Sequence, residues 1–98
     1  MAKQKIDMRI LFKKLGELRT SVGIDKWSFE HVEAIASKLG YTVSKKVEDN
    51  KEVIEIKEIG KKIGRPLNAV VSIVVDYVKK SGKSLDEVIN ELKQVLKK

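Results

Sequence analysis

The chain has 98 residues, of which 42% are hydrophobic, and its formal net charge is +7. This length suits one modest hydrophobic core, and we predict a single domain over residues 1–98. The absence of cysteine excludes a disulfide framework and a thiolate metal site. The only histidine, His31, cannot form a histidine cluster, so we expect neither a metal nor a cofactor.

The excess of basic side chains favours an anionic partner, and nucleic acid is the commonest such partner for a small soluble protein. The longest apolar run, residues 69–75 interrupted by Ser72, is far shorter than the roughly 20 residues that span a bilayer. The first ten residues lack the apolar core of a signal peptide. We therefore expect a cytoplasmic protein without membrane contact. Charged residues make up 36% of the chain, and this high share, mostly Lys and Glu, is typical of a thermophile protein.

Two helices are predicted in the first part of the chain. Residues 1–7 form a short basic tail, and the spacing of the apolar residues after it predicts a first helix over residues 8–19. Ser28 is a good N-cap for a second helix, and Gly40 supplies the left-handed residue that ends it.

A β-hairpin is predicted next, with a two-residue turn at residues 49–50. This turn places Val43 opposite Ile56 and Lys45 opposite Ile54. One face of the ribbon is then apolar and the other polar, as an antiparallel ribbon packed on helices requires.

A third helix is predicted to start at Pro66, after a basic linker over residues 60–65. Its polar residues Asn68, Ser72 and Asp76 recur every fourth position and form one narrow stripe. A helix that is apolar over most of its surface must be buried on two sides, so we predict a homodimer through this helix. The predicted dimer interface consists of Val70, Ile73, Val74 and Tyr77.

The fourth helix follows the capping box of residues 84–87 and forms a C-terminal helical hairpin with the third, over residues 66–98. Residues 8–65 hold the first two helices and the β-hairpin. The predicted fold is therefore a small α+β domain with the order α-α-β-β-α-α, in which the antiparallel hairpin packs on the helices.

Residues 37–62 run from a helix end through two strands around a tight polar turn, and finish in a basic Ile-Gly-Lys-Lys. This order resembles the wing that follows the recognition helix in winged-helix DNA-binding domains. The resemblance implies a helix in the major groove and a wing that touches phosphates. Ser37 and Lys38 are then the candidates at base edges. The candidate phosphate contacts are Arg9, Lys13, Lys14, Lys46, Lys57, Lys61, Lys62 and Arg65.

The sequence therefore predicts a small protein that binds double-stranded DNA, a transcriptional regulator or an accessory factor. The alternative is a protein-interaction or structural module that dimerises through its C-terminal helices and does not bind nucleic acid. Residues 82–96 also resemble the second helix of ribbon–helix–helix repressors, in which a capped helix follows a Gly turn, and we interpret them as a capped amphipathic helix that packs or dimerises. The helix–hairpin–helix order also resembles small toxin ribonucleases. That family carries a Gly-Ser-His motif, which this chain lacks, so we predict no enzyme and no small-molecule substrate.

Overall fold

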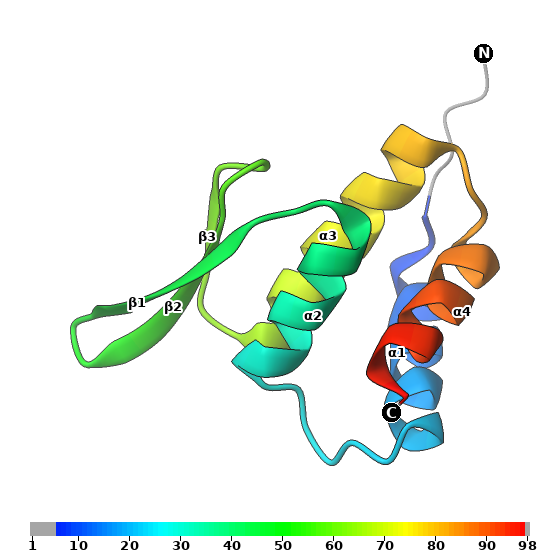
Figure 1. Cartoon of the computed structure of the whole chain (residues 1–98), viewed down its shortest axis with the longest axis horizontal. Helices are drawn as coiled ribbons and strands as arrows, with labels where there is room; N and C mark the ends of the chain where they lie inside the picture. Colours follow the sequence, from blue (N-terminus) through cyan, green and yellow to red (C-terminus); the bar gives the residue numbers. More distant parts are fainter. Residues whose placement is uncertain (1–5, 98) are drawn as a thin grey trace.

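The structure is a computed structural model that describes residues 6–97. It confirms a small α+β domain with the predicted order of helices and strands (Figure 1). The elements in chain order are α1 (Met8–Ser21), α2 (Phe29–Leu39), β1 (Val43–Glu48), β2 (Lys51–Ile56), β3 (Lys61–Ile63), α3 (Pro66–Ser81) and α4 (Leu85–Leu96).

Helix α1 begins at Met8, as predicted, and ends at Ser21, two residues beyond the predicted end. The Asp7 carboxylate accepts a hydrogen bond from the backbone N–H of Arg9 at 2.9 Å and caps the helix. Ile6 is half-buried against the core, and the rest of the predicted tail lies outside the described residues. The buried side of α1 consists of Leu11, Leu15 and Leu18.

Both ends of α2 agree with the prediction. Ser28 is the N-cap, and the Nδ1 atom of His31 accepts a hydrogen bond from the Ser28 backbone N–H at 3.1 Å. Gly40 ends the helix with a φ of 84°, a left-handed conformation that glycine adopts without steric cost. The Tyr41 N–H then donates to the Ala36 carbonyl at 2.7 Å and closes the helix end.

The hairpin has the predicted register. Val43 pairs with Ile56, and Lys45 pairs with Ile54. Asp49 and Asn50 have φ angles of 50° and 63°, so both turn residues are left-handed. A two-residue turn of this kind matches the twist of the strands that it joins.

The segment predicted as a basic linker contains a third strand. Strand β3 pairs antiparallel with β2, with Ile63 opposite Ile54, and the sheet order is β1-β2-β3. The turn before it is closed by the Gly60 N–H, which donates to the Ile56 carbonyl at 2.8 Å. The linker prediction was wrong because a three-residue strand with one inward apolar side chain, Ile63, gives no period to detect.

Helix α2 lies at the centre of the fold and packs on α3, α4 and β1. The sheet packs on α3 through β2 and β3, whereas α1 packs mainly on α4. Figure 1 shows the sheet on one side of the molecule and α1 with α4 on the other, with the tip of the β1–β2 hairpin reaching beyond the helices. The two C-terminal helices follow one another, but each packs more extensively on α2 than on the other.

The single chain covers three of the four residues that we predicted at a dimer interface. Val70, Ile73 and Val74 are each 0% exposed, because α2, the sheet and α4 surround α3. Tyr77 is half-buried. The second side of α3 is therefore covered from within the chain, and these three side chains offer no surface to a partner in this conformation. Dimerisation itself stays a prediction.

Candidate nucleic-acid interface

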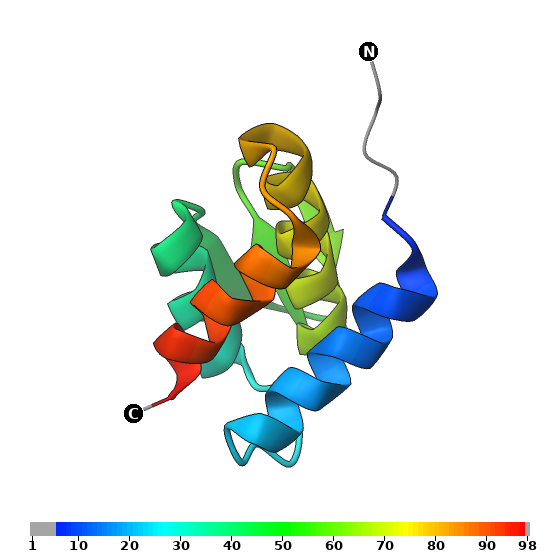
Figure 2. The same cartoon turned by 90° about the vertical axis from the view of Figure 1, so that its right-hand side faces the viewer.

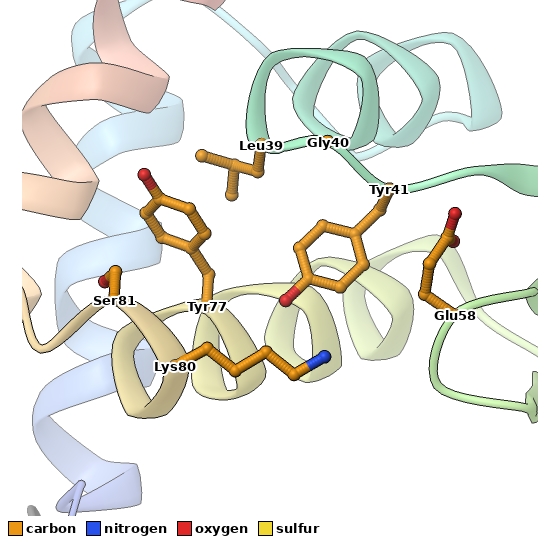
Figure 3. Close-up of a pocket in the computed structure, with 7 residues that line it drawn as sticks. All are labelled: Leu39, Gly40, Tyr41, Glu58, Tyr77, Lys80 and Ser81. Carbon is orange, nitrogen blue, oxygen red and sulfur yellow. The ribbon is translucent and has the colours of Figure 1, made fainter.

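Three parts of the fold meet at one end of the molecule, namely the C-terminal ends of α2 and α3 and the turn between β2 and β3. They surround a hollow of about 300 Å³ (Figure 3). The hollow is lined by Leu39, Gly40, Tyr41, Glu58, Tyr77, Lys80 and Ser81. In Figure 3 the Tyr41 and Tyr77 rings stand on either side of it, with Lys80 reaching below Tyr41.

Hydrogen bonds hold these three parts together. The Tyr41 hydroxyl donates to Oδ2 of Asp76 on α3 at 2.5 Å, and Lys80 Nζ lies 3.0 Å from the same oxygen. On the other side, the Thr42 N–H donates to the Glu58 carboxylate at 2.7 Å. The segment after α2 is thus tied both to α3 and to the β2–β3 turn, which fixes the relative positions of all three.

The charge states at this end follow from the same contacts. Burial raises the pKa of Tyr41 strongly, and the hydrogen bond to Asp76 raises it further, so the phenol stays protonated. Burial also acts to raise the pKa of Asp76, but the hydrogen bonds from Tyr41 and Lys80 outweigh it and the net pKa is lowered. The backbone hydrogen bond from Thr42 lowers the pKa of Glu58. The two carboxylates are therefore ionised structural acceptors.

Four exposed lysines lie on the segments that form this end, and we call them the basic end: Lys38, Lys57, Lys61 and Lys79. Lys38, Lys57 and Lys79 each adjoin in sequence a residue that lines the hollow, and Lys61 opens β3 just after the turn. Within residues 6–97 none of the four makes an ion pair. Lys38 and Lys79 occupy the last turns of α2 and α3, where a helix dipole favours a cation.

Unlike the lysines of the basic end, several lysines of the wing-like hairpin and of β3 form ion pairs with carboxylates of the sheet. Lys46, a predicted phosphate contact, lies 3.3 Å from Glu55, and Lys62 lies 3.1 Å from Glu48. The hydrogen bond to Glu48 raises the pKa of Lys62. Lys45 likewise lies 2.9 Å from Glu52. These pairs reduce the charge that the hairpin offers to a polyanion.

The remaining predicted contacts lie away from the basic end. Arg9 and Lys13 are exposed on α1, on the side of the molecule opposite the sheet (Figure 1), and Lys14 pairs with Asp86 of α4. Arg65 is the N-cap of α3 and lies 14 residues before Lys79, a distance of about 21 Å along the helix axis. Of the predicted set, Lys38, Lys57 and Lys61 therefore lie on the segments of the basic end, and the exposed Ser37 precedes Lys38 in α2, whereas the others lie elsewhere.

Sequence reasoning missed Lys79 and the Tyr41–Asp76 pair. Lys79 extends the polar stripe of α3, and its place in the last helical turn was the available signal. The pairing of Tyr41 with Asp76 joins residues 35 positions apart, which no local pattern reveals. His31 is engaged in the capping box and lies 6.1 Å from the Trp27 ring, edge to face.

The described part of the chain contains no group of three His, Cys, Asp or Glu side chains arranged to hold a metal ion. None of the helices between residues 6 and 97 combines the length and apolar character needed to cross a bilayer. Comparisons with protein-family models, with curated proteins and with solved structures give no match for this chain.

Proposed function

We propose that the protein binds double-stranded DNA through the basic end, as a small regulator or accessory factor without catalytic activity. The observation that carries the proposal is that Lys38, Lys57 and Lys79 come from three different segments and each adjoin in sequence a residue that lines one hollow, while none of them makes an ion pair within residues 6–97. Lysines held at fixed spacing on a folded surface are suited to phosphate contacts.

The acids nearby do not cancel this charge. Asp76 pairs with Lys80, and Glu58, which is exposed, ionised and hydrogen-bonded to the Thr42 N–H, offsets only one of the four lysines. The basic end therefore keeps a local positive excess. Because phosphate contacts carry no sequence information, we expect binding that depends mainly on ionic strength.

Ser37 and Lys38 are the side chains of α2 best placed to reach base edges, since they are exposed in its last turns beside the basic end. The earlier exposed residues of the helix are Glu30 and Glu33, which repel phosphates. An approach by the C-terminal turn of α2 would differ from that of helix-turn-helix proteins, whose recognition helices contact bases with their N-terminal residues.

The test compares two neighbouring lysines in β3. Lys61→Gln removes a lysine without an ion-pair partner, whereas Lys62→Gln removes one that pairs with Glu48. Binding of a labelled random-sequence duplex is measured at several salt concentrations. We expect Lys61→Gln and Lys57→Gln each to weaken binding on all sequences and to reduce the salt slope by about 1.

Lys62→Gln is the matched control, and it should leave affinity and slope nearly unchanged. The proposal fails if the wild-type protein does not bind the duplex even at low salt. It also fails if Lys61→Gln and Lys62→Gln weaken binding equally, because the ion pairs would then not decide which lysines contact DNA.

A further inference from the structure

Both tyrosines of the chain line the hollow between α2, α3 and the β2–β3 turn, and their rings are not equally covered. Tyr41 is 8% exposed, and its hydroxyl is bound to Asp76. Tyr77, which we predicted at a dimer interface, is only half-buried, whereas the other residues of that prediction are buried completely. The hollow therefore has one aromatic wall, the Tyr77 ring, that a ligand can still reach (Figure 3).

The Tyr77 ring is held in place from outside the hollow. Lys83 Nζ lies 5.7 Å from the centre of the ring and also contacts both carboxylate oxygens of Glu91, at 3.2 and 3.3 Å. Lys83 is not among the residues that line the hollow, so its ammonium group leaves the hollow side of the ring free. A planar ligand can stack there on a ring that is already fixed, at a small cost in conformational entropy.

The surroundings of Tyr77 suit a flat group without negative charge. Leu39 closes the hollow beside the Tyr77 ring in Figure 3, and the volume of about 300 Å³ is at the lower end of the range for small-molecule sites. The carboxylate that lines the hollow belongs to Glu58, which lies beyond Tyr41 in Figure 3 and accepts a hydrogen bond from the Thr42 N–H at 2.7 Å. The Tyr41 ring therefore stands between this carboxylate and a group stacked on Tyr77.

Cations are available for phosphate groups attached to such a ring. Lys38 and Lys79 adjoin two lining residues in sequence, are exposed, and make no ion pair within residues 6–97. An aromatic platform combined with a positively charged surface is the means by which proteins bind single-stranded nucleic acid. An uncharged ligand would gain nothing from these lysines, so the combination favours a nucleotide.

We propose that the hollow receives an unpaired DNA base, which stacks on Tyr77 while the neighbouring phosphates contact Lys38 and Lys79. This inference rests on the proposed function, and it names the form of DNA that the basic end prefers, namely a duplex with an unpaired base at its end or in a bulge. In a continuous duplex every base is paired and stacked on its neighbours. The hollow then stays unused, and only the phosphate contacts remain.

The test compares labelled DNA probes in one buffer: a blunt duplex, the same duplex with short thymidine overhangs on both strands, and a version whose overhangs carry abasic sugars. The two probes with overhangs have equal numbers of phosphates, so a difference between their affinities comes from the bases. The wild-type protein should bind the thymidine probe about tenfold more tightly than the abasic probe.

Substitutions of Tyr77 locate the stacking site. Tyr77→Leu should abolish the preference for the thymidine probe and leave the affinity for the blunt duplex unchanged, which also shows that the variant is folded. Tyr77→Phe keeps the ring and should keep the preference. Phe12→Leu is the matched control, because Phe12 is a 45% exposed aromatic residue on α1, which Figure 2 shows apart from the C-terminal ends of α2 and α3.

The probes separate this inference from the proposed function. If the wild-type protein binds the blunt duplex but does not distinguish thymidine from abasic overhangs, the inference fails and the proposed function stands. A Tyr77→Leu variant that keeps the preference, or a Phe12→Leu variant that loses it, overturns the inference as well. Binding of the thymidine probe without binding of the blunt duplex supports the inference and refutes duplex binding. A protein that binds none of the probes overturns both.

Discussion

The Tyr41 hydroxyl and the Asp76 carboxylate are 2.5 Å apart, although 35 residues separate them in the sequence. The bond joins the chain just after α2 to the C-terminal half of α3, and Lys80 holds the same carboxylate from the next turn. The segments that carry Lys38 and Lys79 are thereby fixed relative to each other. The relative positions of Lys38 and Lys79 thus depend on the hydrogen bond between Tyr41 and Asp76.

Replacing Tyr41 with phenylalanine tests this dependence. Tyr41→Phe keeps the buried ring but leaves a half-buried carboxylate without one of its donors, so we expect a loss of about 2 kcal/mol in unfolding free energy. Urea denaturation measures the change. The isosteric Asp76→Asn variant serves as the comparison, since its amide oxygen still accepts from Tyr41. A Tyr41→Phe variant as stable as the wild type would show that the bond contributes nothing net.

Acid stability provides an independent test of Asp76. The folded-state pKa of Asp76 lies below its ordinary value of 3.8, so its ionised form stabilises the fold above that pH. This contribution is lost as the pH falls through 3.8 toward the lower folded-state pKa. We expect the unfolding free energy of Asp76→Asn to decline less between about pH 5 and pH 2 than that of the wild type. Parallel declines for the two proteins would contradict the assignment.

Replacing Asn50 in the hairpin turn with glycine should stabilise the protein. Asn50 has a φ of 63°, a conformation that glycine adopts at lower cost than asparagine. Asn50→Gly should therefore raise the unfolding free energy by about 0.5 kcal/mol, and Asn50→Val should lower it by about 1 kcal/mol or more. Thermal unfolding followed by circular dichroism measures both. If valine is tolerated as well as glycine, the left-handed turn is not maintained in solution.

Because His31 belongs to the capping box of α2, we expect two substitutions of this residue to differ in their effect on stability. His31→Ala removes the acceptor of the Ser28 N–H and should cost about 1 kcal/mol, whereas His31→Gln retains an acceptor at the position where capping boxes prefer Glu or Gln. Comparison of the two urea midpoints gives the difference. Equal losses in the two variants would point to the lost packing against Trp27 rather than to the cap.

Helix ends and the hairpin could be predicted because their signals are local. Ser28 and Gly40 mark the ends of α2 through capping and backbone conformation, and the polar turn at residues 49–50 fixes the register of β1 and β2. Each signal operates over a few residues, the range in which sequence alone determines conformation.

Contacts between residues far apart in the sequence could not be predicted from such local signals. Because α3 is apolar around most of its surface, the sequence showed that two of its sides must be buried. It did not show that Val70 and Val74 are buried by α2, the sheet and α4. The sequence also did not show which lysines at the candidate site form ion pairs. Lys61 and Lys62 are adjacent lysines that the sequence does not distinguish by charge, and only the fold places Glu48 within reach of Lys62.

The packing of α1 on α4 joins the first helix of the chain to the last. During synthesis the apolar side chains Leu11, Leu15 and Leu18 leave the ribosome long before α4, the helix that mainly covers them. Until then, the nascent chain must keep this apolar surface from associating with other molecules. A stop codon before Leu85 would therefore release a chain that exposes its first helix and aggregates.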